Sequence, residues 1–390
     1  MGGCAAGRGP RASGPTRAGD AGAGRVSGAG GGMGRPALTG RRPVLVTGGA
    51  GFIGSNLADR LAQQGHDVLV FDALARPGVE ANLAWLQQRH PARISTMVAD
   101  IRDAAAVEEA LRDAQVVFHL AGQVAVTTSL VAPQDDFDIN LRGTFMLLEG
   151  LRRRGGGVPL VFASTNKVYG NLGDVALEQV GECYVPSDPA VRASGIGEAR
   201  PLDFHTPYGC SKGAADQYVL DFDRSFGVPT VVLRMSCIYG QRQMGTEDQG
   251  WVAHFLIRAL KGEPISIFGD GRQVRDVLQV DDAVRAYLNA WGRIGTVHGR
   301  AFNLGGGPGN AISLRQLVAA IEELLGRRVE LQFADWRAGD QRYYVSDTRA
   351  TRLELGLAEP TSWRAGVAAL AQWLEREGGL QAATKLEALT

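Results

Sequence analysis

Short apolar runs alternate with helix-like segments from Pro43 onward, and this alternation constrains the fold more than any other feature of the sequence. Near-continuous apolar runs are typical of parallel strands buried on both faces, while apolar residues at helical spacing favour connecting helices. We therefore predict an α/β fold with a doubly wound parallel sheet covered by helices on both faces. The expected strands are 44–46, 68–71, 94–98, 116–120, 160–163 and 230–234, and the expected helices between them are 52–64, 104–112, 137–152 and 211–226.

A glycine-rich turn, residues 47–54 (TGGAGFIG), separates the first expected strand from the first expected helix. Gly48 allows a tight turn, Gly51 lets the backbone approach a pyrophosphate at the helix N-terminus, and Gly54 lets the helix pack closely on the strand. Asp72 ends the second strand, where a carboxylate accepts the ribose hydroxyls of NAD and repels the 2′-phosphate of NADP. The pattern predicts a Rossmann-like domain that binds NAD.

Tyr208 and Lys212 lie four residues apart at the start of an expected helix, so both side chains project from the same face. A phenol with a pKa of about 10 is a poor base at neutral pH, but a neighbouring ammonium and an oxidised nicotinamide both favour the phenolate. Tyr208 is therefore a candidate general base. After the strand 160–163, Thr165 is the candidate donor to the substrate oxygen that Tyr208 deprotonates.

Composition disfavours several other classes of protein. The 41 basic and 41 acidic residues cancel, so no overall basic field favours nucleic acid. No apolar run approaches the roughly 20 residues of a membrane-spanning helix. The four cysteines show no CxxC spacing, which disfavours a zinc site or a disulfide framework and fits a cytoplasmic enzyme. We expect no metal, no nucleic acid and no membrane among its partners.

The motifs together resemble the extended short-chain dehydrogenase/reductase family, in its branch of nucleotide-sugar epimerases and dehydratases. The resemblance runs from about residue 43 to residue 373 and includes the glycine-rich turn, the Tyr208–Lys212 pair and the segment 269–276 (GDGRQVRD). Segments 164–170 (STNKVYG), 202–218 and 248–251 (DQGW) are similar to the CDP-tyvelose and CDP-paratose 2-epimerases.

The resemblance implies a role for individual residues. It makes Thr165, Tyr208 and Lys212 the catalytic group. The implied cofactor-binding residues are Gly48, Gly51, Phe52, Ile53, Gly54, Asp72, Asp100, Ile101, Ala121 and Lys212. The implied substrate-binding residues are Gln123, Asn166, Arg242, Arg275, Arg337 and Asp340, with the Arg275 fork suited to the substrate diphosphate. Cys237 departs from the pattern, because many relatives have a diphosphate-binding Asn there.

The activity that the resemblance implies is an NAD-dependent nucleotide-sugar epimerase, converting CDP-paratose to CDP-tyvelose by inversion at C2. A UDP-hexose 4-epimerase needs the same catalytic group and is the alternative. A 4,6-dehydratase is disfavoured because Asn166 and Lys167 stand where dehydratases have an Asp–Glu pair. A catalytically inactive member is disfavoured because Tyr208 and Lys212 are both present. Helices 137–152 and 211–226 resemble the family's interface helices, so we expect a homodimer or homotetramer.

The expected domains follow from these assignments. Residues 1–41 are rich in Gly and Arg and lack the apolar side chains that offset the entropy of ordering, so we expect a disordered extension. Residues 42–235 are predicted to form the NAD-binding domain that carries the catalytic residues. Residues 236–376 are predicted to form mainly a nucleotide-sugar-binding lobe, partly interleaved with the first domain, and residues 377–390 a tail.

Overall fold

The computed structural model describes residues 42–155, 157–337 and 339–376, so the predicted extension 1–41 and tail 377–390 lie outside the described residues. A seven-stranded sheet has the order β12-β8-β5-β4-β1-β2-β3, with every neighbouring pair parallel. Its strands are β1 (Val44–Thr47), β2 (Val68–Asp72), β3 (Ile94–Val98), β4 (Val116–His119), β5 (Leu160–Thr165), β8 (Thr230–Met235) and β12 (Arg300–Leu304). The predicted doubly wound parallel sheet is confirmed.

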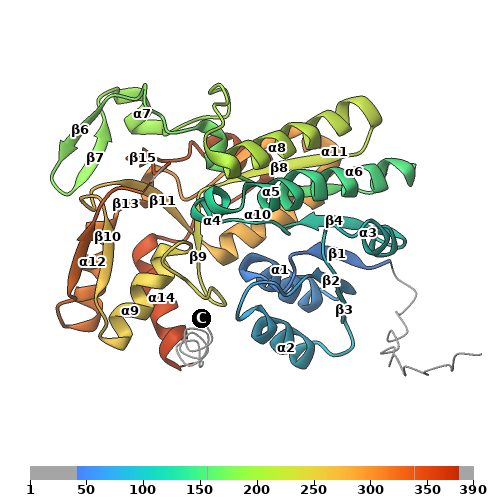
Figure 1. The fold of residues 1–390 in the computed structure, drawn as a ribbon, viewed down its shortest axis with the longest axis horizontal. Coiled ribbons are helices and arrows are strands. Elements are labelled where there is room, and N and C mark those ends of the chain that lie inside the picture. Colours follow the sequence, from blue (N-terminus) through green and yellow to red (C-terminus); the bar gives the residue numbers. More distant parts are fainter. Residues whose placement is uncertain (1–41, 156, 338, 377–390) are drawn as a thin grey trace, which may run out of the picture. The chain divides into compact units, whose positions relative to one another are not determined.

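Helices cover both faces of this sheet, as Figure 1 shows. Residues alternate along each strand: Val44 and Val46 of β1 face one apolar core, while Leu45 faces the other. Both cores are apolar, which is why the strands are continuous apolar runs rather than alternating ones. The first core is covered by α1 (Phe52–Gln63), α2 (Val79–Arg89) and α10 (Val280–Gly292), and the second by α3 (Ala104–Leu111), α6 (Gly143–Arg153) and α8 (Thr206–Phe226).

The strand order places a crevice beside β1. From β1 the chain continues to β2 and β3 on one side, and β4 then pairs with β1 on the other side. Ligands of doubly wound sheets bind at the carboxyl ends of the strands, where the order reverses. The glycine-rich turn follows β1 directly and therefore lies at this point.

Two expected helices differ in their bounds. The segment expected as one helix over 137–152 contains the end of α5 (Pro133–Phe137), a π-helical segment (Asp138–Arg142) and α6, and α4 (Val126–Val131) precedes them. Helix α8 begins at Thr206 rather than at residue 211, because Pro207 stands in its first turn, where a missing N–H costs nothing.

A smaller lobe follows β8. Its mixed sheet joins β9 (Cys237–Tyr239), β11 (Val274–Gln279), β13 (Ala311–Ser313) and β15 (Tyr343–Tyr344), and a parallel pair joins β10 (Ile265–Phe268) and β14 (Leu331–Ala334). The helices that pack in its core are α9 (Trp251–Lys261), α12 (Leu314–Leu325) and α14 (Trp363–Arg376). The chain returns to the large sheet with β12. We propose that the boundary between the NAD-binding domain and the smaller lobe lies near residue 235.

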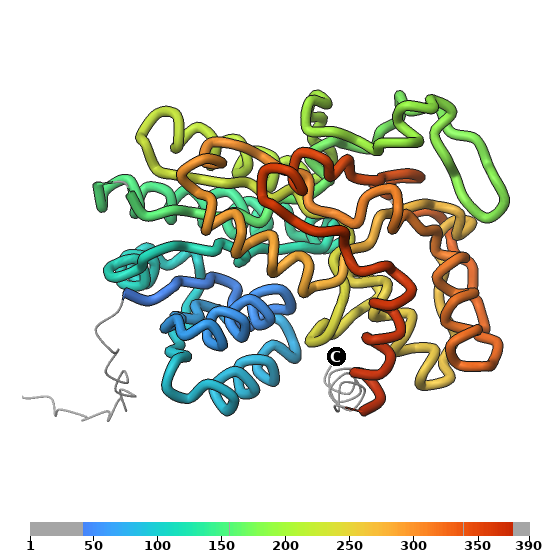
Figure 2. Tube along the Cα trace, turned by 180° about the vertical axis from the view of Figure 1, so that it is seen from behind, coloured from blue at the N-terminus to red at the C-terminus, as the bar shows by residue number. Residues whose placement is uncertain are grey.

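The long polar insertion before α8 contains a hairpin. Strands β6 (Leu177–Val180) and β7 (Cys183–Pro186) pair antiparallel, and α7 (Pro189–Ser194) follows them. Figures 1 and 2 both place the hairpin at the small-lobe end, beside β13 and β15. The remaining short helices are α11 (Ile294–Val297) and α13 (Arg349–Leu355). Over the described ranges, no helix has the length and apolar character needed to cross a membrane.

Candidate active site

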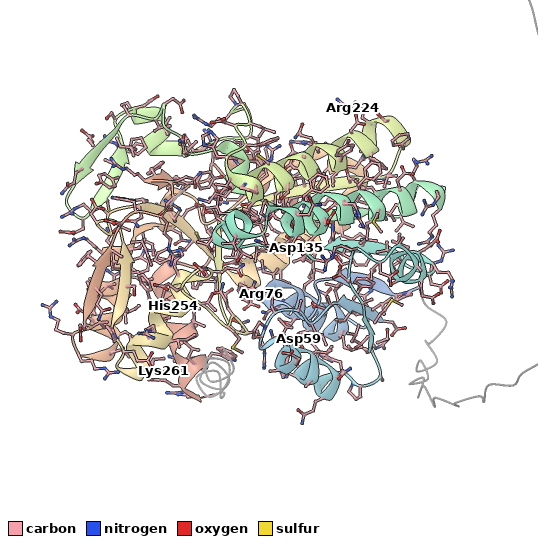
Figure 3. The ribbon with its side chains drawn as sticks, in the orientation of Figure 1. Asp59, Arg76, Asp135, Arg224, His254 and Lys261 are labelled. Atoms are coloured by element: carbon pink, nitrogen blue, oxygen red, sulfur yellow. The ribbon has the colours of Figure 1, made fainter. Side chains whose placement is uncertain are left out.

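One cavity of about 1020 Å³ runs from the glycine-rich turn to the small lobe. Figure 3 labels three of its lining residues, Arg76, Asp135 and His254. Every predicted catalytic and cofactor-binding residue lines it, and so does every predicted substrate-binding residue except one. The predicted residues found in its lining are Gly48, Gly51, Phe52, Ile53, Gly54, Asp72, Asp100, Ile101, Ala121, Gln123, Thr165, Asn166, Tyr208, Lys212, Arg275, Arg337 and Asp340.

The glycine-rich turn fits a dinucleotide. A Cβ on Gly48 would lie 2.6 Å from the backbone nitrogen of Ala121, and one on Gly54 would lie 2.1 Å from the carbonyl oxygen of Gly48. Gly48 also has φ +68°, a conformation that favours glycine. Gly51 is the N-cap of α1, and no side chain caps this helix end. Its amides are therefore suited to binding the pyrophosphate of NAD.

Two carboxylates line the same end of the cavity. Asp72 accepts hydrogen bonds from the backbone N–H groups of Ala50 (3.0 Å) and Leu74 (2.9 Å), so its carboxylate is fixed at the carboxyl end of β2. This position suits the adenosine ribose of NAD. Asp100 pairs with Arg102 at 2.7 Å, and the hydrogen bond from this guanidinium holds the pKa of Asp100 below its usual range.

The three catalytic candidates come together between β5 and α8. Thr165 ends β5, and its hydroxyl is hydrogen-bonded to the phenol of Tyr208 in the first turn of α8. One turn later, Lys212 Nζ donates to the carbonyl oxygen of Ala163 at 2.5 Å. The same ammonium lies 4.2 Å from the ring centroid of Phe162. Strand and helix thus fix the three side chains at the cavity wall.

The titration of this group is governed by burial. Burial raises the pKa of Tyr208 to about 12, although the bond from Thr165 opposes the rise and the charge of Asp136 adds to it. Burial lowers the pKa of Lys212 to about 8, against the opposing charges of Asp216 and Asp136. The neighbouring ammonium is predicted to favour the phenolate, but in the protein alone the cost of desolvating the phenolate is the largest influence on the pKa of Tyr208.

The small lobe supplies cationic side chains. Arg275 is buried on β11, and its Nη2 donates to Asp340 Oδ1 at 2.6 Å. Arg337 Nη1 donates to the carbonyl oxygen of Glu247 at 2.8 Å, and its guanidinium carbon lies 3.7 Å from the ring centroid of Phe268. Arg275 also donates from Nη1 to the carbonyl oxygen of Val274 at 2.8 Å, and Arg337 forms ion pairs with Glu247 and Asp248. The two guanidinium groups place positive charge in the wall, which suits a diphosphate.

Two predicted substrate-binding residues line the cavity with amides that make local contacts. Gln123 Nε2 donates to the carbonyl oxygen of Ala125 at 2.8 Å, and Gln123 Oε1 accepts from the N–H of the same residue at 2.6 Å. Asn166 Oδ1 lies 3.4 Å from Thr165 Oγ1. Their roles toward substrate stay predictions.

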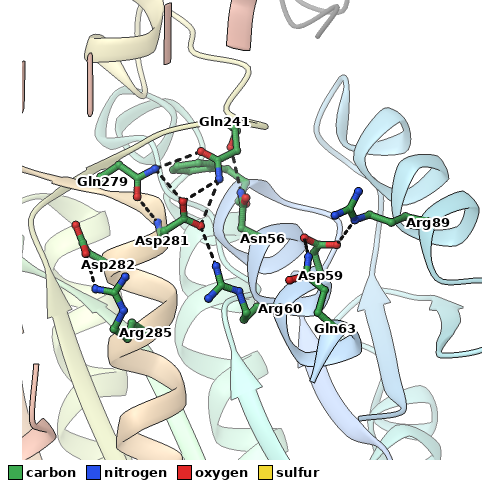
Figure 4. Close-up of polar contacts among 11 residues, drawn as sticks. Asn56, Asp59, Arg60, Gln63, Arg89, Gln241, Gln279, Asp281, Asp282 and Arg285 are labelled. Carbon is green, nitrogen blue, oxygen red and sulfur yellow. Dashed lines mark hydrogen bonds and ion pairs between the residues drawn. The ribbon is translucent and has the colours of Figure 1, made fainter. Parts of the chain in front are cut away.

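Arg242 is the predicted residue that the structure does not bring to the cavity. Its guanidinium carbon lies 3.6 Å from the ring centroid of Trp85 on α2. Two side-chain amides hold the loop that carries Arg242. Asn56 Nδ2 donates to the carbonyl oxygen of Gln241 at 3.0 Å (Figure 4). Asn82 Nδ2 donates to the carbonyl oxygen of Arg242 at 3.3 Å. A cation–π contact between distant segments thus places this arginine outside the site.

Three cationic residues that line the cavity, Lys167, Arg76 and Arg102, were not among the residues predicted from the sequence. Lys167 stands in the STNKVYG segment two residues after Thr165, which was the available signal. Cys237, at the departure from the family pattern, also lines the cavity, and Trp251 Nε1 donates to its sulfur at 3.4 Å.

The chain belongs to the NAD dependent epimerase/dehydratase family, whose model matches residues 44–305. This confirms the family that the motifs predicted, and NAD is its cofactor. The CDP-paratose 2-epimerase of Salmonella typhi is 40% identical over 339 residues, which cover 85% of this chain and 98% of that protein.

Solved structures agree with this family. The UDP-glucose 4-epimerase of Thermotoga maritima with UDP-glucose has a TM-score of 0.73 at 31% identity, over 86% of this chain and 99% of that one. The UDP-glucuronic acid 4-epimerase of Bacillus cereus, in complex with UDP-glucuronic acid and NAD, has a TM-score of 0.73 at 26% identity, over the same shares.

Proposed function

We propose that the protein is an NAD-dependent nucleotide-sugar epimerase that converts CDP-paratose to CDP-tyvelose by inversion at C2. The observation that carries this proposal is one cavity in which Thr165, Tyr208 and Lys212 meet the glycine-rich turn at one end and Arg275 at the other. The 40% identity to a CDP-paratose 2-epimerase over nearly its whole length supports the choice of substrate.

The chemistry follows from the inert nature of a carbinol carbon, which has no acidic proton to exchange. NAD⁺, when bound, supplies a hydride acceptor that also returns the hydride. Tyr208, as the phenolate that the Lys212 ammonium and an oxidised nicotinamide favour, takes the proton of the C2 hydroxyl, while Thr165 donates a hydrogen bond to the same oxygen and holds it in place. When the keto sugar has turned its other face, Tyr208 gives the proton back. Lys212 stays protonated beside Tyr208 and Thr165, and it would bind the nicotinamide ribose of the cofactor.

The residues after Thr165 argue against dehydration. Loss of water needs an additional acid and base, and the amide of Asn166 cannot transfer the proton. A 4-epimerase remains the second candidate, because the UDP-glucose 4-epimerase of Thermotoga maritima has this fold at 31% identity.

Product stereochemistry separates the two candidates. Purified protein is incubated with CDP-paratose and, separately, with UDP-glucose, and the products are assigned by NMR. We expect inversion at C2 of CDP-paratose and no galactose from UDP-glucose. Inversion at C4 of UDP-glucose with CDP-paratose unchanged would contradict the proposal.

We further propose that the enzyme acts in the cytoplasm as a homodimer or homotetramer. Helices α6 and α8 carry Phe145, Tyr218 and Phe226, which are 38%, 44% and 48% exposed. Phe145 and Tyr218 contact each other, with ring centroids 5.3 Å apart. An exposed aromatic face on two adjacent helices favours association with a second copy.

A further inference from the structure

Lys167 lies between the catalytic candidates and the cationic wall of the small lobe. Its backbone N–H donates to Thr165 Oγ1 at 3.2 Å, which fixes it at the carboxyl end of β5. Its side chain lines the cavity, and Nζ donates to the carbonyl oxygen of Gly339 at 3.2 Å. An ammonium has three donors, and the hydrogen bonds of the described residues use one of them.

The charges around this ammonium favour an anion. Arg275, Asp340 and Cys237 act on it electrostatically, and Arg275 forms the ion pair with Asp340. Two cations therefore share one carboxylate. Burial and the charge of Arg275 lower the pKa of Lys167 to about 8, against the opposing effects of Asp340 and Cys237. Two positive charges beside one carboxylate leave a net positive charge, which favours an anion as a further partner.

The reaction explains why such a cation lies so close to the catalytic threonine. In a hexose, C4 lies across the ring from C1, the carbon that carries the diphosphate, whereas C2 is bonded to C1. An enzyme that inverts C2 must therefore hold the β-phosphate nearer to the catalytic tyrosine than a 4-epimerase does. Lys167 follows Thr165 by two residues, so it places a cation close to the catalytic residues, where the β-phosphate of a C2 substrate must lie.

Resting on the proposed function, we infer that the Lys167 ammonium binds the β-phosphate of the nucleotide sugar together with Arg275, and so holds C2 against Tyr208. Lys167 is thereby a substrate-binding residue that favours reaction at the carbon next to the phosphate.

Binding of nucleotides without the reacting sugar tests this role. Affinities of the NAD-loaded protein for CMP, CDP and CDP-glucose are measured by calorimetry for the wild type and for Lys167→Met. We expect Lys167→Met to weaken CDP and CDP-glucose by about tenfold or more, because a charge-assisted hydrogen bond is lost, and to leave CMP within about twofold. Lys167→Arg, which keeps the charge, should recover most of the CDP affinity.

Lys261→Met is the matched control, because Lys261 ends α9 and is not among the cavity-lining residues. The NAD content and thermal unfolding of each variant verify that it is folded. Unchanged CDP affinity in Lys167→Met overturns the inference. Weakening of CDP-glucose without weakening of CDP also overturns it, because the ammonium would then bind the sugar. Failure of the wild type to invert CDP-paratose contradicts the proposed function instead, whatever the variants bind.

Discussion

Tyr208 has the most demanding task of any single residue, because it must lose a proton from a buried position. Replacing it with Phe removes the group that exchanges protons with substrate and keeps the ring. We expect turnover to fall by about 100- to 10,000-fold, the usual contribution of a general acid–base group. Affinity for NAD and CDP should stay within about twofold. Turnover within tenfold of the wild type would show that another group does the proton transfer.

Lys212 should make folding stability depend on pH. Its pKa is about 8 in the folded protein and 10.5 for a free lysine. Between these values the unfolded chain binds a proton that the folded chain does not, so the free energy of unfolding rises as pH rises from 8 to 10. Lys167 acts in the same direction, because its pKa is also lowered to about 8.

Urea unfolding at pH 7.5, 9 and 10 checks this dependence. In Lys212→Met the rise should be smaller than in the wild type by on the order of 1–3 kcal/mol. Lys261→Met, which removes a lysine that does not line the cavity, is the control. Equal slopes in wild type and Lys212→Met would mean that burial does not lower the pKa of this lysine.

The junction of β1 and α1 depends on Gly54. Its Cβ position lies 2.1 Å from the carbonyl oxygen of Gly48, so Gly54→Ala must push the helix away from the strand. We expect a loss of about 1–3 kcal/mol in unfolding free energy, as for overpacked sites, and at least a tenfold loss of NAD affinity.

Gly292→Ala is the matched control, since a Cβ at the end of α10 would meet no heavy atom within 4 Å. It should leave NAD affinity unchanged and alter stability by less than about 1 kcal/mol. NAD titration and urea unfolding of both variants give the comparison. Wild-type NAD affinity in Gly54→Ala would contradict the proposed path of the cofactor.

The sequence predicts the large sheet because its strands are buried on both faces and leave continuous apolar runs. The hairpin of β6 and β7 left no such signal, since β6 is largely exposed and its residues are mixed in character. The glycine-rich turn and the Tyr208–Lys212 pair are local patterns, so the sequence was enough to propose them. The position of Arg242 depends on Trp85, more than 150 residues away, and no local pattern reports such a contact.

The exposed aromatic face of α6 and α8 predicts that copies of the protein associate. Tyr218→Asp places a charge in this face and should shift the protein toward monomer, because burying the carboxylate is costly. Leu353→Asp, at a position on α13 that is 78% exposed, should keep the wild-type mass. Light scattering after size exclusion measures both. A monomeric wild type, or a Tyr218→Asp variant of wild-type mass, would contradict the proposed interface.

The proposed mechanism requires that the hydrogen of C2 leaves this carbon and returns to it without entering water. CDP-paratose carrying deuterium at C2 is converted by the purified protein in ordinary water, and the product is examined by NMR and mass spectrometry. We expect CDP-tyvelose that retains the deuterium at C2. Product with protium at C2 would show that the hydrogen exchanges with solvent, and that the proposed chemistry is wrong.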